Sequence, residues 1–456
     1  MQIDAMQLIV IVAWYMIPLS ILFFSGVVFR AKSFIGLAAG AFTFNYLLRV
    51  IAILFNETAG IFAPKVQWRY GIGIYEDYVL TGNYLGLIFE PFGAQVLWNL
   101  PVWAFTDATR PSLLFSNAGA SALAASLAAI MVRSVTSRRI AIAVMVIFSM
   151  YLGAFNFAMF GLRDPLLALA SGTLGCAVLR IGLGQFRTPE ILAGIAGAGF
   201  SLWLRPEQFF IVLFVLGLPL AAYYVNLFRG PGNKRRNFGI AFFLTVPLIA
   251  VGVGMILVAT LVAGKNIGTK TLNPVQIADE NAEDRFNRHV GSDYGSGSNI
   301  VDVQTYQNMP VFVRVPVQVI GLVVLPFPWQ IRGPEQLLAF VDSVFLIVLL
   351  IASLRFVRAR HSIDQGRWVV IALLATFAIG IVGMGFVISN AGNGFRMRMA
   401  VVPFLMLAAG VAIGSKTNYR RRRFPYVELY RDDYDDADET GDDDRVDYSE
   451  AESTAT

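Results

Sequence analysis

Long apolar runs recur along the chain from Met6 to Gly414, and they constrain its fold more than any other feature. Each run is about 17 to 25 residues long, the length that an α-helix needs to cross about 30 Å of hydrocarbon. The runs do not alternate apolar and polar residues, as the strands of a membrane β-barrel would. Hydrophobic residues make up 56% of the 456 residues and charged residues only 15%, which excludes a water-soluble globular protein of this size. The sequence therefore predicts an all-α polytopic membrane protein.

Basic residues indicate the topology, because Lys and Arg collect in the cytoplasmic loops of membrane proteins. Five basic clusters separate apolar runs: Arg30 with Lys32, Arg133 with Arg138 and Arg139, Arg229 with Lys234–Arg236, Arg355–Arg360, and Arg420–Arg423. With all five in the cytoplasm, the N-terminus lies outside and the C-terminus inside. The first run lacks a basic leader and a cleavage site, so we expect a retained helix. About eleven spans are then expected, at 6–29, 33–55, 112–133, 139–161, 165–181, 190–204, 206–228, 238–263, 337–355, 368–388 and 399–415.

Two further apolar stretches, 84–105 and 311–331, contain charged residues and prolines. If only one of them crossed the membrane, every later basic cluster would change sides. We therefore expect both to be interfacial or re-entrant helices on the extracytoplasmic side. If both cross, the number of spans rises to about thirteen.

The hydrophilic parts of the chain are two outside loops and a tail. The loop 56–111 mixes aromatic and polar residues, and the loop 264–310 is rich in polar residues; long loops in compact membrane proteins are commonly functional or disordered. The tail from about Tyr430 is rich in Asp and Glu and cannot form a core, so we expect it to be disordered in the cytoplasm. It either solvates the C-terminus or docks a cytoplasmic partner.

Composition also excludes several partners. The sequence pI is about 9.2, but the positive charges sit in short loops, where topology and anionic lipids explain them, so nucleic acid is not expected to bind. The chain has a single cysteine, Cys176, and two distant histidines, His289 and His361. A cysteine or histidine metal site is therefore not expected either.

Four arginines lie at helix ends that this topology places outside the membrane. Outside loops need no arginine for topology, so these side chains call for another explanation. The planar guanidinium group suits phosphate oxygens, and a lipid phosphate or pyrophosphate at the membrane surface is the expected ligand. Alternatively, each arginine snorkels to the interface or pairs with a neighbouring acid. The four are Arg163 in "GLRDP", Arg205 in "WLRPEQ", and Arg396 and Arg398 in "GNGFRMRM".

Carboxylates in the outside segments are the candidate catalytic groups. Glu76 and Asp77 lie in "IYEDYV", a few residues after Arg69, a further candidate phosphate ligand. A carboxylate beside the membrane can deprotonate an acceptor hydroxyl or orient a metal ion, although two loop acids can equally be solvated and inert. Asp164 adjoins Arg163 and suits a ligand or hydrogen-bond acceptor better than a base.

The layout resembles the GT-C class of membrane glycosyltransferases. The resemblance rests on three features in chain order. They are a long outside loop with "YEDY" and amphipathic segments, close-set spans with "LRDP" in the next outside loop, and a second long outside loop. The resemblance implies a seven-helix module at 33–263 with the loop 56–111, Asp77 as the catalytic aspartate, and Asp164 as a second acidic residue. It assigns no cofactor and leaves a divalent cation open. The remaining parts are an extra helix at 1–32, a loop region at 264–336, C-terminal helices at 337–415 and a tail at 416–456.

Three stretches are similar to bacterial polysaccharide-biosynthesis membrane proteins, including repeat-unit polymerases of the Wzy type. They are "GLRDPLL", "PFPWQ" and "GNGFRMRMAVVPFLML". In those proteins, arginines on the outer face are thought to hold the polyprenyl pyrophosphate. The resemblance implies the same role for Arg163, Arg396 and Arg398.

The expected function is that of an inverting glycosyltransferase in the cytoplasmic membrane. It would transfer a sugar from a polyprenyl-phosphate-linked donor to a cell-envelope glycan or lipid-linked acceptor at the extracytoplasmic face, in contact with membrane lipid. One alternative is a Wzy-like polymerase that joins pyrophosphate-linked repeat units. Others are a lipid-linked glycan flippase, for which Arg49, Arg180 and Asp342 are the midspan charges, and a non-catalytic scaffold.

Overall fold

The computed structural model consists of helices and their connecting turns, with no strand in the part of the chain that it describes. All described residues belong to one unit, Met1–Lys416. The expected spans 206–228 and 238–263, the loop 264–310 apart from its last two residues, and the acidic tail lie outside the described residues. The described residues are 5–60, 72–90, 92–106, 108–159, 163–183, 185, 187–205, 309–331, 333–358, 364–387, 396 and 398–416.

Long apolar helices identify this as a membrane-embedded α-helical protein. Within the described residues, five helices are long and apolar enough to cross a membrane: α1 (Ala5–Val28), α2 (Ile35–Ala59, extended to Lys32 by a 3-10 turn), α6 (Arg110–Arg133), α9 (Asp164–Gly182) and α16 (Pro334–Arg358). The described part also contains α7 (Arg138–Ser149), α8 (Leu152–Met159), α10 (Thr188–Leu204), α17 (Asp364–Val387) and α19 (Val402–Lys416). Large apolar side chains on α1, α2 and α16 remain exposed, as lipid-facing residues would be.

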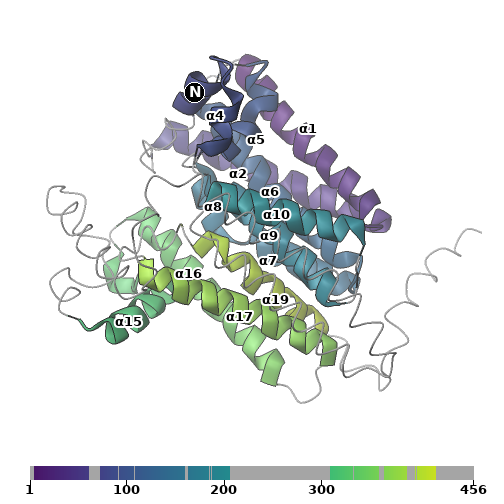
Figure 1. Cartoon of the computed structure of the whole chain (residues 1–456), viewed down its shortest axis with the longest axis vertical. Helices are drawn as coiled ribbons and strands as arrows, with labels where there is room; N and C mark the ends of the chain where they lie inside the picture. The colour runs from purple at the N-terminus through teal and green to yellow at the C-terminus, as the bar shows by residue number, and fades with distance from the viewer. Residues whose placement is uncertain are drawn as a thin grey trace, which may run out of the picture. The chain divides into compact units, whose positions relative to one another are not determined.

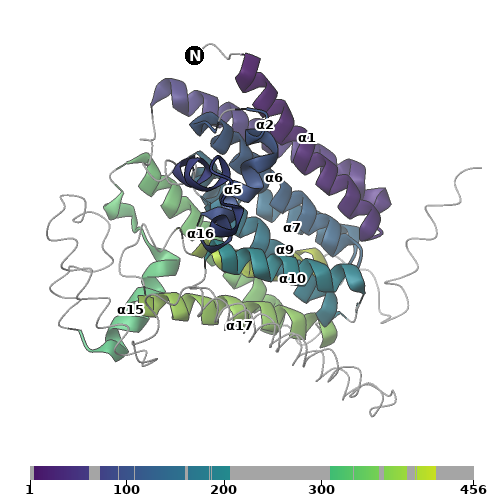
Figure 2. The same cartoon turned by 45° about the horizontal axis from the view of Figure 1, so that its top comes forward.

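Helix α6 is the centre of the fold. The most apolar stretch of α6 is completely buried. The helix packs against α1, α2, α7, α8 and α9 (Figures 1 and 2). Its sequence, "SNAGASALAASLAAI", consists mainly of Ala, Ser and Gly. Small residues let helix backbones approach closely, which is how helices associate where water supplies no hydrophobic driving force. The composition of α6 therefore explains its central place.

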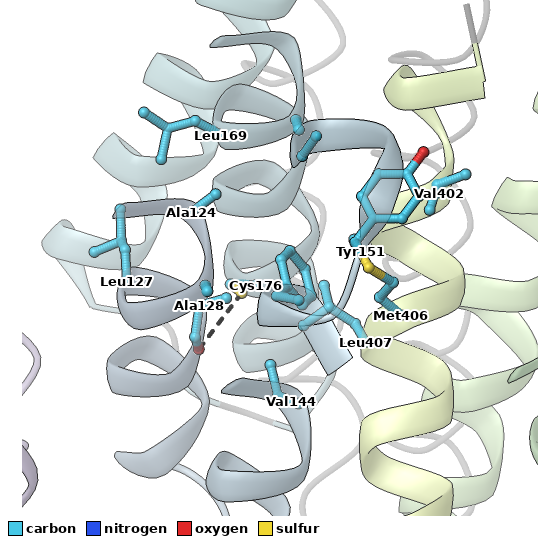
Figure 3. Packing of buried hydrophobic residues seen from close by; sticks show 14 of the residues in the cluster. Ala124, Leu127, Ala128, Val144, Tyr151, Leu169, Cys176, Val402, Met406 and Leu407 are labelled. Atoms are coloured by element: carbon cyan, nitrogen blue, oxygen red, sulfur yellow. Dashed lines mark hydrogen bonds between the residues drawn. The ribbon is translucent and has the colours of Figure 1, made fainter. Parts of the chain in front are cut away.

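The C-terminal helix α19 packs into the N-terminal part of the chain. It contacts α7, α9, α16 and α17. Figure 3 shows Met406 and Leu407 of α19 beside Tyr151. The same buried cluster includes Cys176 of α9, whose thiol donates to the Ala128 carbonyl of α6 over 3.8 Å. Docking of α19 brings the segment that precedes it, with Arg396 and Arg398, close to the start of α9.

Residues from several of the basic clusters lie together at one end of the helices. Arg180, near the end of α9, lies over the Phe29 ring after α1 and donates to the Met131 carbonyl near the end of α6. Gly414, near the end of α19, packs against Ile140 at the start of α7. Arg30, Arg133 and Arg138 lie next to these positions in the sequence. The expected topology places these three residues on one side of the membrane.

The expected span 139–161 is interrupted in the structure. Helix α7 ends at Ser149 and α8 begins at Leu152. The backbone N–H of Gly153 donates to Asp342 Oδ1 of α16 at 3.1 Å, so a side chain from a distant helix occupies the position of an N-terminal cap. The structure thus divides the expected span into two helices, and this break depends on the distant Asp342 side chain, which cannot be read from the local sequence.

The two stretches that were not expected to span form short helices. Segment 84–105 contains α4 (Tyr84–Phe89) and α5 (Gly93–Trp103), and segment 311–331 contains α15 (Val311–Val324) followed by a 3-10 turn, Pro328–Gln330. At about 1.5 Å per residue, none of these helices is long enough to cross about 30 Å of hydrocarbon.

Close packing of α10 on α9 gives a testable prediction about stability. A Cβ atom added at Gly197 would lie 2.8 Å from the Leu174 backbone nitrogen and 2.9 Å from the Ala170 carbonyl oxygen. Gly197→Ala should therefore push the two helices apart and lower the free energy of unfolding by about 1–3 kcal/mol. Thermal unfolding of the detergent-solubilised protein measures this.

Gly199 is the matched control, because a Cβ atom there meets nothing within 4 Å. Gly199→Ala should leave the melting temperature unchanged or slightly raised, since alanine favours helix more than glycine does. Equal melting temperatures for the two variants would contradict the close α9–α10 contact.

Candidate anion-binding site

The candidate site is built on Asp164, the first residue of α9. Its side chain is completely buried, and its two carboxylate oxygens accept from two different arginines. Arg205 Nη2 lies 3.0 Å from Oδ1, and Arg396 Nε lies 3.2 Å from Oδ2. An acid in the first turn of a helix is also favoured by the partial positive charge of the exposed amides there. Two arginines that follow Asp164 by 41 and by 232 residues in the sequence thus meet at its carboxylate.

Prolines set the helix boundaries that present these side chains. Pro165 follows Asp164 near the start of α9, where its missing N–H costs no hydrogen bond. Helix α10 ends at Leu204, one residue before Arg205, and residue 206 is a proline. A residue that precedes proline is biased away from helical conformation. Arg205 accordingly has φ −150° and ψ 88°, an extended conformation in which its side chain reaches Asp164.

The start of α5 and the end of α10 contribute aromatic rings beside the arginines. The guanidinium carbon of Arg163 lies 4.5 Å from the centre of the Phe92 ring, at the start of α5. The next residue, Gly93, packs close to Trp203 of α10. Phe200 meets Trp203 edge to face, with ring centres 6.4 Å apart. A guanidinium over an aromatic face is stabilised by the ring's quadrupole, so α5 is held against the helix ends that contain the arginines.

Three guanidinium groups, those of Arg163, Arg205 and Arg396, act on the single carboxylate of Asp164. The cluster therefore has an excess of positive charge. A guanidinium group has five N–H donors, so an arginine bound to a carboxylate can still donate to a phosphate oxygen. The Arg396 side chain is 19% exposed and that of Arg205 is 9% exposed. The chemistry of this cluster suits a phosphate or another oxyanion.

Arg398 belongs to a second, separate ion pair. Its Nη2 lies 2.6 Å from Asp342 Oδ2, and its Nη1 donates to the Leu322 carbonyl at 3.0 Å and to Ser343 Oγ at 3.2 Å. Arg398 is 1% exposed and Asp342 is completely buried. The sequence grouped Arg398 with the other three arginines, but the structure gives it a different carboxylate.

The predicted catalytic acids Glu76 and Asp77 are exposed. They lie in a single π-helical turn, Tyr75–Val79, in the first outside segment. Among the described residues, neither carboxylate forms a hydrogen bond or ion pair with the arginine cluster. Arg69 lies outside the described residues. Of the predicted site residues, the structure thus brings together Asp164, Arg163, Arg205 and Arg396.

Glu90 is an acid of this region to which sequence reasoning assigned no role. Tyr78 donates its hydroxyl hydrogen to Glu90 Oε1 over 2.7 Å. This hydrogen bond and the negative charge of Glu90 raise the pKa of Tyr78. Because Glu90 precedes Phe92 by two residues, the pair connects the turn of Asp77 to the aromatic rings beside Arg163. A signal existed in the sequence, since Glu90 is the only acid in the apolar segment 84–105.

The other buried charges lie elsewhere. Near the basic end, Arg180 forms a buried ion pair with Glu190 and also donates to a backbone carbonyl. Arg49 of α2 donates to Ser121 Oγ of α6 at 2.9 Å and to Asn45 on its own helix. These contacts tie helices together. The described residues contain no group of three or more His, Cys, Asp or Glu side chains that could hold a metal ion.

Comparison with protein-family models, with curated proteins and with solved structures gave no match. The described helices and the site therefore define the class of protein by themselves. It is a membrane-embedded helical protein with a buried aspartate that two arginines share.

Removal of the Asp164 charge should destabilise the protein. Asp164→Asn keeps the shape of the side chain but leaves Arg205 and Arg396 facing each other without a carboxylate. Breaking a buried ion pair in this way costs about 3–5 kcal/mol, so the melting temperature in detergent should fall markedly. Asp77→Asn is the control, since Asp77 is exposed and its substitution should change stability little. Equal stability of the two variants would contradict the role of Asp164 as the centre of the cluster.

Proposed function

We propose that this protein is an integral membrane glycosyltransferase. It transfers a sugar from a polyprenyl-phosphate-type lipid donor to a cell-envelope glycan or lipid-linked acceptor at the extracytoplasmic face. The observation that carries the proposal is the convergence of Arg163, Arg205 and Arg396 on Asp164, at the end of the helices opposite the basic clusters.

The arginines would act on the leaving group. When the bond between the sugar and the carrier breaks, negative charge develops on the lipid phosphate. Preorganised donors beside that charge are commonly the largest contribution to catalysis, because they act in apolar surroundings and need no rearrangement. Arg205 and Arg396 are held in place by Asp164 before any substrate binds. A lipid carrier would enter sideways between the helices, with its phosphate at their ends.

Asp164 itself is a positioning residue in this mechanism. Both of its oxygens accept N–H groups from arginines, so its carboxylate is committed to them. The proton of the acceptor hydroxyl must therefore go to another acid. Asp77 and Glu76 are exposed in the first outside segment, which contacts the arginine cluster through Phe92. We propose Asp77 as the general base, with Glu76 beside it.

A Wzy-like polymerase is the same proposal with a larger donor, because a pyrophosphate-linked repeat unit presents the same oxyanion to the arginines. The products distinguish the two, since a transferase adds one sugar and a polymerase lengthens the glycan by whole repeat units. A flippase would move the lipid without forming a glycosidic bond.

Arginine geometry gives the first test. Arg205→Lys and Arg396→Lys keep the positive charge but lose the planar fork that matches phosphate oxygens. Each should reduce glycosyl transfer about 100-fold, the typical cost of losing one preorganised donor at a developing charge. The measurement is the rate of transfer from a polyprenyl-phosphate-linked sugar, with purified protein in nanodiscs.

Arg138→Lys is the matched control, because Arg138 is exposed at the other end of the helices. It should transfer at the wild-type rate. If Arg205→Lys and Arg396→Lys also transferred at that rate, the arginines would not bind the leaving group. Lipid movement without a new glycosidic bond would identify a flippase instead.

Substitution of the acids gives the second test. Asp77→Asn should lower kcat about 100-fold or more, the usual contribution of a general base, while the affinity for the lipid donor stays unchanged. Glu76→Gln and Glu90→Gln are made in parallel and should have smaller effects on kcat. If Asp77→Asn kept the wild-type kcat and Glu90→Gln had a greatly lowered kcat, the general base would be Glu90 and not Asp77.

A further inference from the structure

A short segment before α19 is anchored on two sides. Arg396 and Arg398 are separated by one residue, yet they bind acids on different helices, Asp164 at the start of α9 and Asp342 in α16. The 3-10 turn Arg398–Ala400 begins at Arg398 and leads into α19, and it contacts α9, α17 and α19. This segment therefore joins the candidate site to the C-terminal helices.

The second anchor is the more deeply buried of the two. Asp342 Oδ2 accepts from Arg398, and its Oδ1 accepts the N–H of Gly153 at the start of α8. Arg398 also donates to the Leu322 carbonyl of α15 and to Ser343 of α16. One ion pair thus holds α8, α15 and α16 against the backbone of residue 398.

Arg398 is poorly suited to bind a substrate itself. It is 1% exposed, and its two terminal nitrogens already donate to a carboxylate, a carbonyl and a hydroxyl. To reach a phosphate it would have to leave Asp342 as an uncompensated buried charge, which is strongly unfavourable. Arg396, by contrast, is partly exposed and bound through its Nε to Asp164.

We infer that Arg398 and Asp342 form a positioning pair, which holds Arg396 at the phosphate site and does not bind the substrate. The inference rests on the proposed function, because it gives Arg396 the role of a phosphate ligand. Consecutive Cα atoms are 3.8 Å apart, so two residues span at most about 7 Å. Fixing residue 398 against three helices therefore confines the backbone of Arg396 to that short reach.

Tyr151 supports the connection between the two pairs. Its side chain is buried, and its hydroxyl lies close enough to interact electrostatically with Arg398, Asp342 and Asp164. Figure 3 shows the ring beside Met406 of α19. The backbone gives the direct connection, because Arg396 and Arg398 are separated by one residue.

The test is a double-mutant cycle on affinity for a short-chain polyprenyl pyrophosphate, measured with full-length protein in nanodiscs. A single substitution would leave one buried charge without its partner and destabilise the fold, so Arg398 is replaced together with Asp342, as Arg398→Met with Asp342→Asn. Loss of both charges leaves no uncompensated ion, and the Asn carbonyl still accepts from Gly153. The other arm of the cycle is Arg396→Met.

We expect Arg396→Met to weaken pyrophosphate binding about tenfold or more, as loss of a charge-assisted hydrogen bond should. The paired variant should weaken it to a similar extent while its melting temperature stays near that of the wild type. Adding Arg396→Met to the paired variant should cause little further loss, because both changes act through the same contact. Arg138→Met, at the opposite end, should bind as the wild type does.

The other outcomes separate the two proposals. If the losses of pyrophosphate affinity in the paired variant and in Arg396→Met multiply when the variants are combined, Arg398 binds the phosphate directly and the positioning role is wrong. If Arg396→Met weakens binding but the paired variant binds normally, only the positioning inference fails. If Arg396→Met itself binds normally, the phosphate site is contradicted, and with it both the proposed function and the role of Arg398.

Discussion

A carboxylate buried among apolar helices must be paired, and this requirement shapes the candidate site. An unpaired ion in such surroundings is strongly unfavourable, so Asp164 is stable there only while cations accompany it. Its partners come from the end of α10 and from the segment before α19. The arginine cluster is therefore a consequence of where Asp164 is buried. The same constraint acts on Asp342, which takes Arg398 as its partner.

The helix packing determines which side chains can meet. The small residues of α6 let α1, α2, α7, α8 and α9 surround it, and α19 then packs against α7 and α9. As a result, residues near positions 164, 205 and 396 lie at one end of the helices, while Arg180 and Glu190 pair near the other. The two ends thus differ in chemistry. One end combines basic clusters with a closed ion pair, and the other combines arginines with aromatic rings from α5 and α10.

Local sequence was enough to predict the apolar helices and to place Arg163, Arg205 and Arg396 at or beside helix ends. Length, hydropathy and the position of a charge relative to a helix end are all local properties. Pairings between distant residues are not local properties. For this reason Asp342 was not recognised as the partner of Arg398, and the break between α7 and α8 was missed. The hydrogen bond between Tyr78 and Glu90 also depends on how the chain turns at residues 80–83. The roles of Glu76 and Asp77 stay predictions.

The cap on α8 also bears on biosynthesis. Gly153 and the aspartate that accepts its amide hydrogen are 189 residues apart, so after Gly153 the ribosome must add more than a third of the chain before that acceptor exists. Until then, the gap after α7 lacks the carboxylate that completes it. Early helices can insert and associate, but the start of α8 reaches its final form only after α16 has entered the membrane. The order of synthesis thus makes assembly of the Asp164 cluster a late event, because Arg396 follows α16 in the chain.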